Sequence, residues 1–136
     1  MIKGYDIRAE TPSVAVYRHL RSAAGLSQKS EAAAQAGLPN TWFGVVVYAG
    51  DEPVGMGRVI GDGGTVFQIV DIAVHPDHQG RGLGKSIMAE LTRQLSERAP
   101  ATALVSLLAD GAAKHLYEQF GFTETAPTSI GMARRF

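Results

Sequence analysis

The sequence contains no cysteine, and this absence excludes several kinds of chemistry at once. A disulfide scaffold, a zinc site built on thiolates and a cysteine nucleophile are all ruled out. Neither sign of charge is in excess, because 13 Lys and Arg residues balance 13 Asp and Glu residues. A general nucleic-acid binder normally has a clear basic excess, so we expect no nucleic-acid partner.

Long apolar runs are also missing. No segment approaches the roughly 20 apolar residues that a membrane-spanning helix needs. The first ten residues, MIKGYDIRAE, do not resemble a signal peptide. We therefore expect a cytoplasmic protein without a membrane partner. With 45% hydrophobic residues in a chain of this length, residues 1–136 are predicted to form a single domain.

The first half of the sequence predicts helices followed by strands. A strand over 3–10 precedes a helix that begins with Thr11 as N-cap and Pro12 in its first position. An Ala-rich helix over 27–36 comes next. Three segments rich in β-branched and aromatic residues then predict an antiparallel meander, over 41–48, 54–60 and 65–74.

The second half predicts a crossover. Apolar residues at helical spacing indicate a helix of about 16 residues: Leu83, Ile87, Leu91 and Leu95. A buried strand over 103–108 follows, which implies a parallel pair with the strand 65–74. A helix over 113–120 and two short strands, near 122–125 and 129–135, complete the chain. The predicted fold class is α/β, with a mixed, mostly antiparallel sheet and helices on both faces.

Three glycines lie where the strand 65–74 gives way to the next helix: Gly80, Gly82 and Gly84. A backbone without Cβ atoms can come close to a ligand. The first amide N–H groups of a helix have no internal partners, and the helix dipole favours an anion there. Arg81 and Lys85 add positive charge. Residues 79–86 are therefore predicted to bind a phosphate or pyrophosphate.

Two common phosphate-binding patterns fail on spacing. The P-loop pattern ends in the Gly84-Lys85-Ser86 found here, but Gln79 stands where its first glycine is required. A dinucleotide fingerprint begins at Gly80, but its third glycine comes one residue early. Neither an ATP loop nor a dinucleotide loop is predicted.

The pattern [RQ]-x-x-G-x-[GA] does fit, as QGRGLG over 79–84, and IAVHPDH precedes it. A second block, AKHLYEQFGF over 113–122, reads A-x-x-L-Y-x-x-x-G-F. In this order, the two blocks resemble the acetyl-CoA motif and the later helix of the GNAT superfamily of N-acetyltransferases. The order of elements predicted over the whole chain is similar to that of the family.

The resemblance implies acetyl-CoA as cosubstrate. The backbone of the strand end would pair with the pantetheine arm beside a bulge that opens the sheet, and the glycine-rich turn would hold the pyrophosphate. The residues implied in binding are Ile72, Ala73, Val74, Gln79, Gly80, Arg81, Gly82, Leu83, Gly84, Lys85 and Ser86. Asp110 stands where the family often has an asparagine that touches CoA, and helix capping is its other interpretation. No metal is expected, because the H-x-x-H pair of His75 and His78 lacks a third ligand.

The resemblance also implies a general acid. Tyr117 matches the family tyrosine near the CoA sulfur, where it could protonate the leaving thiolate; a core tyrosine is the alternative. No residue is evident as the general base, since Gln68 stands where some relatives have glutamate. Asp71, a water chain or an amine that is already neutral remain as candidates.

The predicted function is transfer of acetyl from acetyl-CoA to the primary amine of a small molecule. Direct attack in a ternary complex is expected because no cysteine can first accept the acetyl group. A non-catalytic acyl-CoA-binding or sensor module is the alternative. Assembly as a homodimer is left open by the sequence.

Overall fold

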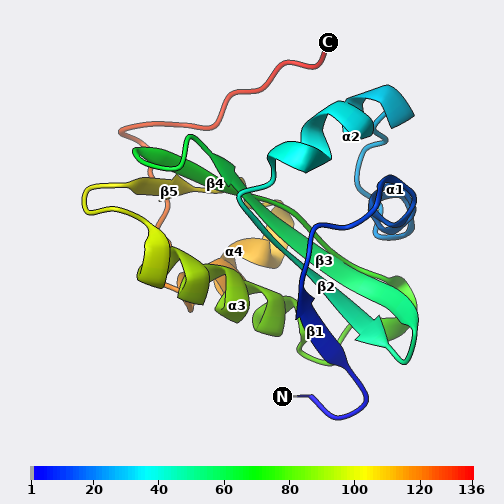
Figure 1. Ribbon diagram of the computed structural model, residues 1–136. Coiled ribbons are helices and arrows are strands. Elements are labelled where there is room, and N and C mark those ends of the chain that lie inside the picture. The colour runs from blue at the N-terminus through cyan, green and yellow to red at the C-terminus, as the bar shows by residue number, and fades with distance from the viewer. Residues whose placement is uncertain (1) are drawn as a thin grey trace.

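The computed structural model describes residues 2–136, which build a five-stranded sheet in the order β1-β2-β3-β4-β5 (Figure 1). Neighbouring strands from β1 to β4 are antiparallel, and β4 and β5 are parallel. The mixed, mostly antiparallel sheet is therefore confirmed. The strands are β1 (Asp6–Ala9), β2 (Phe43–Ala49), β3 (Glu52–Gly61), β4 (Val66–Val74) and β5 (Leu104–Ser106).

Helices cover both faces of this sheet, also as predicted. The helix α1 (Val14–Ala23) packs on β3 and β4 from one side, together with α2 (Glu31–Gly37). The long helix α3 (Leu83–Arg98) packs on β2, β3 and β4 from the other side, and α4 (Lys114–Glu118) adjoins its first turn. Three short 3-10 turns link these elements: η1 (Leu38–Asn40), η2 (Pro76–His78) and η3 (Gly111–Ala113).

Two apolar clusters hold the layers together. Between α3 and the sheet lie fully buried residues of both elements, among them Val45, Val59, Ile87 and Leu91. Ile87 packs so closely that a Cβ atom at Gly57 of β3 would stand 2.5 Å from its Cγ2 atom. The smaller cluster, between α1 and the sheet, consists of Tyr17, Leu20, Ala34, Leu38, Met56 and Ala73. Each layer thus removes its apolar side chains from water, which is the main driving force for the fold.

A bulge interrupts β4 beside Gly57. Met56 of β3 is paired with Ala73 and Arg58 with Val70, so both Asp71 and Ile72 lie opposite Gly57. Two residues opposite one define a β-bulge, which bends its strand. Asp71 has a φ of +58°, in the left-handed region that Asp and Asn enter more readily than most residues.

The parallel pairing of β4 and β5 is short. Only Val66, Phe67 and Gln68 of β4 are paired, with Leu104, Val105 and Ser106 of β5. Within residues 2–136, no strand pairs with the β5 side of β4 from Ile69 to Val74. Amide groups on such an edge are free to bind a ligand that lies alongside.

Several predicted boundaries are wrong: the helix predicted over 27–36 begins only at Glu31, and the strand predicted over 3–10 spans only Asp6–Ala9. The N-cap of α1 is Ser13 rather than Thr11, because the Ser13 Oγ accepts a hydrogen bond from the Val16 amide at 3.2 Å. The strand predicted over 103–108 has only three paired residues, Leu104–Ser106. Sequence propensity locates an element better than its ends, because end positions depend on tertiary partners.

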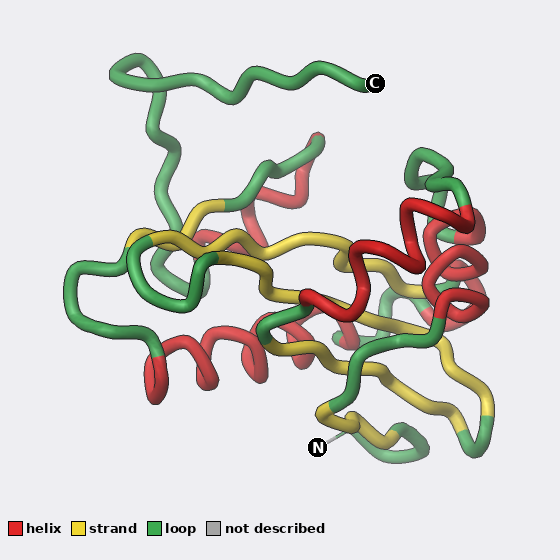
Figure 2. Tube along the Cα trace, turned by 45° about the horizontal axis from the view of Figure 1, so that its top comes forward, coloured by secondary structure: helices red, strands yellow, loops and turns green. Residues whose placement is uncertain are grey.

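The two strands predicted near 122–125 and 129–135 are also wrong. Beyond Phe122, the chain forms neither strand nor helix, and Figure 2 shows it running clear of the sheet. A strand needs a neighbour to satisfy its backbone, and within the described chain this segment pairs with none. Across residues 2–136, no helix has the length and apolar character needed to cross a membrane.

Candidate active site

The first turn of α3 presents free backbone donors. The N-cap is Gly82, and the first helical hydrogen bond runs from the Ser86 amide to its carbonyl at 3.1 Å. The amides of the preceding turn therefore have no partner inside the helix. No side chain caps them, so a bound anion can accept their hydrogen bonds.

The glycines of this turn are explained by its backbone. Gly80 and Gly82 have φ values of +76° and +83°, which other residues rarely adopt. A Cβ atom at Gly80 would meet nothing within 4 Å, so the turn faces open space. Arg81 and Lys85 are both exposed beside it and give the opening positive charge. The site suits a group with several negative charges.

A cleft of about 390 Å³ joins this turn to the unpaired edge of β4. Its walls come from the end of β4, the glycine-rich turn and the start of α4, three elements that are distant in the sequence. The residues that line it are Ile72, Val74, His78, Gln79, Gly80, Gly82, Leu83, Gly84, Ala113 and Leu116. One end of the cleft is therefore lined by the polar glycine-rich turn, and the other is apolar.

The cleft gathers seven of the residues implied by the family motif: Ile72, Val74, Gln79, Gly80, Gly82, Leu83 and Gly84. The side chain of Ala73 is buried on the other face of the sheet, in the cluster beneath α1. Arg81 and Lys85 lie exposed at the rim, and Ser86 is half-buried in the first turn of α3. His78, Ala113 and Leu116 are additional lining residues, and the apolar face of the second motif block could have indicated Leu116.

Gln79 ties the turn to the strand. Its Nε2 donates a hydrogen bond of 2.9 Å to the carbonyl of Val74, the last residue of β4. Tyr5 adds a contact from the N-terminal segment, with its hydroxyl oxygen 2.8 Å from Nδ1 of His78. Both contacts fix the turn against the sheet. A turn held in this way needs little reorganisation when it binds an anion.

On the opposite face of the bulge, Asp71 sits in a buried ionic cluster. Its Oδ1 accepts from Nη1 of Arg21 at 2.6 Å and from the hydroxyl of Tyr17 at 3.2 Å, and its Oδ2 accepts from Nη1 of Arg58 at 2.7 Å. The exposed fraction of all three charged side chains is below 10%. Two guanidinium groups share one carboxylate, so the cluster carries a net positive charge.

These contacts argue against Asp71 as a general base. Both oxygens already accept hydrogen bonds from arginine, and the side chain is only 6% exposed. Removing a proton from an amine would require a carboxylate that the substrate can reach. The arginines instead connect the bulge to its surroundings. Arg21 also donates to Ser27 after α1, and Arg58 donates to Thr41 before β2.

Tyr117 is half-buried on α4 and packs against the core beneath the sheet. Its neighbour Leu116 lines the cleft, whereas Tyr117 is not among the lining residues. Burial raises the pKa of the Tyr117 phenol above its usual value of 10, and the negative charge of Asp110 acts in the same direction. A raised pKa keeps the phenol protonated, as a proton donor requires.

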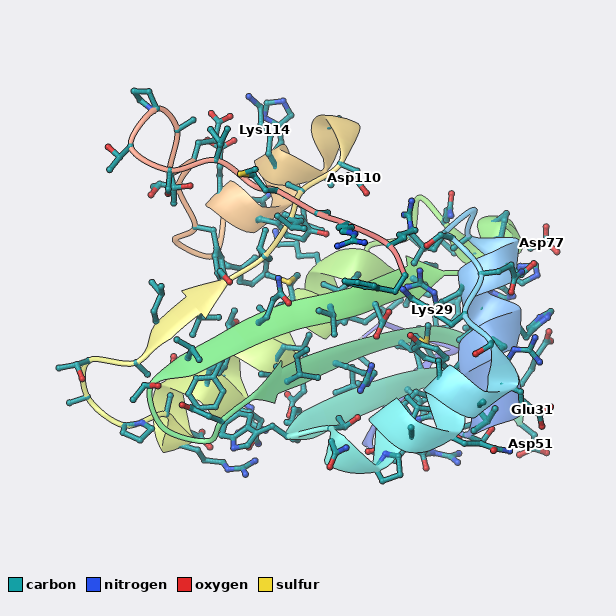
Figure 3. All side chains as sticks on the ribbon, turned by 90° about the horizontal axis from the view of Figure 1, so that it is seen from above. Lys29, Glu31, Asp51, Asp77, Asp110 and Lys114 are labelled. Atoms are coloured by element: carbon teal, nitrogen blue, oxygen red, sulfur yellow. The ribbon has the colours of Figure 1, made fainter. Side chains whose placement is uncertain are left out.

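Asp110 follows β5 and precedes η3, and Figure 3 shows it on the same side of the molecule as Lys114. Its backbone occupies the N-cap position of η3, but its side chain forms no capping hydrogen bond. The interpretation of Asp110 as a helix cap is therefore wrong. Within residues 2–136, no group of three potential metal ligands lies close together, and His75 and His78 belong to none.

Comparison with known proteins identifies this arrangement. The family model described as the acetyltransferase (GNAT) domain matches residues 40–124, from just before β2 to just after α4. The matched part includes the bulge, the glycine-rich turn and the cleft. The chain therefore belongs to the GNAT acetyltransferases.

Solved structures show the same fold over the whole chain. A probable acetyltransferase of unknown function from meticillin-resistant Staphylococcus aureus is 45% identical, with a TM-score of 0.92, covering 97% of this chain and 99% of that one. A GNAT-family acetyltransferase from Streptococcus pneumoniae is 26% identical, with a TM-score of 0.77, covering 97% and 98%.

A curated relative has a more specific name. The [ribosomal protein bS18]-alanine N-acetyltransferase of Escherichia coli is 40% identical over 68 residues, which are 49% of this chain and 44% of that protein. An uncharacterized N-acetyltransferase of Porphyra purpurea is 35% identical over 79 residues, 58% of this chain and 44% of the relative. The chain thus spans less than half the length of these two relatives.

Proposed function

We propose that this chain transfers the acetyl group of acetyl-CoA to a primary amine, and that the amine belongs to a small molecule. The observation that carries the proposal is the cleft in which the first turn of α3 meets the unpaired edge of β4. Membership of the GNAT family supports it. The protein's location in the cytoplasm stays a prediction.

The residues present fit acetyl-CoA. The uncapped amides at the start of α3, beside Arg81 and Lys85, would hold its pyrophosphate. The apolar wall of Ile72, Val74 and Leu116 suits the pantetheine arm, whose amides could bond to the free edge of β4.

The chemistry needs an activated acyl group, which the acetyl thioester supplies. The protein's contribution is to stabilise the oxygen as it gains negative charge, and backbone N–H groups on the β4 edge between Ile69 and Val74 are suitable donors. The Tyr117 phenol would donate a proton to the departing sulfur. A tyrosine phenol is protonated at neutral pH, and burial raises the pKa of Tyr117 further above that range.

The amine must reach the site without a proton, because only the neutral form is a nucleophile. With Asp71 engaged by two arginines, we propose that the amine arrives neutral or loses its proton to water. Asp71 is then a positioning residue that holds the bulge, and with it the divergence of β4 from β5.

We propose direct transfer from thioester to amine in a ternary complex. The absence of cysteine supports this, because a thiol is the side chain best suited to accept acetyl from a thioester. Initial-rate lines should intersect when both substrates are varied. Parallel lines, together with an acetyl group on the protein that passes to the amine, would contradict direct transfer.

Release of free CoA thiol with a panel of amines tests the activity. The panel should contain small primary amines and a peptide with an N-terminal alanine, since one relative is named for that acceptor. Turnover with small amines supports the proposal. Turnover with the peptide alone would show that the acceptor is the N-terminus of a peptide and not a small amine. Binding of acetyl-CoA without thiol release from any acceptor would instead indicate a non-catalytic acyl-CoA-binding module.

A further inference from the structure

His78 is turned inward from an otherwise exposed stretch of the chain. The 3-10 turn η2 ends at His78, and the residues that follow form the glycine-rich turn. Asp77 and Gln79, on either side of His78, are exposed, whereas His78 is half-buried and lines the cleft. Its backbone is fixed locally, because its amide donates a hydrogen bond of 2.9 Å to the carbonyl of His75. The ring therefore has a defined place at the end of the cleft that the glycine-rich turn forms.

The N-terminal segment, residues 2–5, packs against the same turn. A Cβ atom at Gly82 would stand 3.6 Å from Cδ1 of Ile2. Ile2 and Tyr5 both pack on the apolar cluster between α3 and the sheet. The Tyr5 hydroxyl oxygen lies 2.8 Å from Nδ1 of His78, and the two rings meet edge to face, with 5.6 Å between their centroids. Tyr5 thus reaches His78 from a segment that the core holds in place.

The contact with Tyr5 decides which ring nitrogen of His78 can serve a ligand. A phenol O–H that donates to Nδ1 needs this nitrogen without a proton, so the neutral ring carries its proton on Nε2. Within residues 2–136, Nε2 of His78 has no hydrogen-bond partner. No side-chain nitrogen of this part of the chain is both buried and unpaired, so Nε2 is accessible from outside. It is one more N–H donor beside the uncapped amides of the turn.

His78 is held more firmly than the two cations of the site. Arg81 and Lys85 are exposed at the rim, and long side chains lose rotamer freedom when they bind. The ring of His78 is already fixed by Tyr5 and by η2, so little freedom is lost when its N–H engages a ligand. A phosphate oxygen suits this donor, because hydrogen bonds to a charged acceptor are the strong ones.

We propose that Nε2 of His78 donates a hydrogen bond to the pyrophosphate of acetyl-CoA, and that Tyr5 is a positioning residue that fixes the ring and its tautomer. The role of His78 rests on the proposed function, in which acetyl-CoA occupies this cleft. His78 adds a side-chain donor to the backbone donors at the start of α3. It also gives residues 2–5 a part in recognising the cosubstrate, although they precede the first strand.

Two variants of His78 separate hydrogen bonding from packing. His78→Phe keeps an aromatic ring without a donor, and it should weaken acetyl-CoA binding about tenfold or more in titration calorimetry, as the loss of a hydrogen bond to a charged group requires. His78→Gln loses the ring but offers a side-chain N–H, and it should bind within about threefold of the natural chain.

The control for these variants is His19→Phe, the same change at an exposed position of α1 outside the cleft, which should leave binding unchanged. If His78→Phe binds acetyl-CoA as the natural chain does, or if His78→Gln binds no better than His78→Phe, the ring contributes only packing and the proposal is wrong.

The role of Tyr5 is tested by a double-mutant cycle. Tyr5→Phe removes only the hydroxyl, and it should weaken acetyl-CoA binding by about threefold or more when His78 is present. In the His78→Phe background, the same change should have no further effect, because the hydroxyl acts through His78. Equal losses in both backgrounds would show that Tyr5 acts independently of His78, and would overturn its role.

Acetyl-pantetheine locates the contact along the cosubstrate, because it carries the thioester but no pyrophosphate. His78→Phe should lower kcat/KM for acetyl-CoA by about tenfold or more and leave kcat/KM for acetyl-pantetheine nearly unchanged. An equal fall with both donors would put His78 beside the pantetheine arm and overturn its assignment to the pyrophosphate. A natural chain that binds no acetyl-CoA would overturn the proposed function and this role together, whereas binding that survives His78→Phe would overturn the role of His78 alone.

Discussion

The chain before Pro100 and the chain after it are packed in different ways. Within residues 2–136, every buried residue lies between Pro12 and Leu95. The later part contributes one wall of the cleft through α4 and otherwise exposes large apolar side chains, such as Leu108 and Met132. The difference separates two tasks. The early part builds the anion-binding turn, and the later part closes around it.

The largest effect on stability is expected at the buried ionic cluster around Asp71, in the part before Pro100. Asp71→Asn should lower the free energy of unfolding by about 3–5 kcal/mol, because two buried guanidinium groups lose their counter-charge. Asparagine tolerates the left-handed φ at this position, so backbone strain does not enter. Urea unfolding measures the loss. Asp77→Asn, at a side chain 83% exposed, is the control and should change stability by less than about 0.5 kcal/mol.

In the part after Pro100, the next largest effect is expected on kcat, when the hydroxyl of Tyr117 is removed. Tyr117→Phe should lower kcat by about a hundredfold or more, or about 2.7 kcal/mol, and leave acetyl-CoA affinity nearly unchanged. In the natural chain, the fall of kcat caused by ionisation of Tyr117 should come above pH 10, because burial raises the pKa of the phenol. If the variant keeps the natural kcat under conditions where chemistry limits the rate, Tyr117 contributes only packing and is not the general acid.

The anion site can be broken without weakening the fold. Gly84→Asp should lower acetyl-CoA affinity at least tenfold, about 1.4 kcal/mol, because it puts a negative charge beside the pyrophosphate. Stability should not fall, since Gly84 does not have a left-handed φ and an acidic residue suits the first turn of a helix.

Titration calorimetry with acetyl-CoA and thermal unfolding, run on the same sample, separate these two effects. Gly84→Ala is the matched control: its Cβ would stand at an ordinary 3.6 Å from Leu116. If Gly84→Asp and Gly84→Ala bind acetyl-CoA equally well, the first turn of α3 is not the pyrophosphate site.

The smallest effects on stability are expected at the N-cap positions, one in the part before Pro100 and one in the part after it. Ser13→Ala should cost about 1 kcal/mol, because it removes the hydrogen bond to the Val16 amide. Asp110→Ala should change stability by less than about 0.5 kcal/mol, because the Asp110 side chain caps nothing. Paired thermal melts measure both. Equal losses would mean that the two helix starts are capped alike.

The sequence predicts the early part of the fold well, because its signals are local. The spacing of Leu83 and Ile87 marks the face of α3 that is buried, and the glycine-rich turn falls where its pattern places it. The ionic cluster could not be predicted, since Arg21, Arg58 and Asp71 meet only through tertiary packing. The strands predicted after Phe122 do not form in the structure. An alternation of apolar residues indicates that a segment can form a strand, but it does not show which neighbouring strand the segment would pair with.

The short pairing of β4 with β5 has a consequence for the order in which the molecule assembles. The strands from β2 to β4 are consecutive in the sequence and pair with near neighbours, so their contacts can form early. β5 must wait for the whole of α3 to cross the sheet, and it then gains only three paired residues. A growing polypeptide therefore completes its anion-binding turn before the wall formed by α4 exists. We expect partial chains on the ribosome to be folded in the meander yet unable to enclose a thioester, so that the capacity to react appears only with the last third of synthesis.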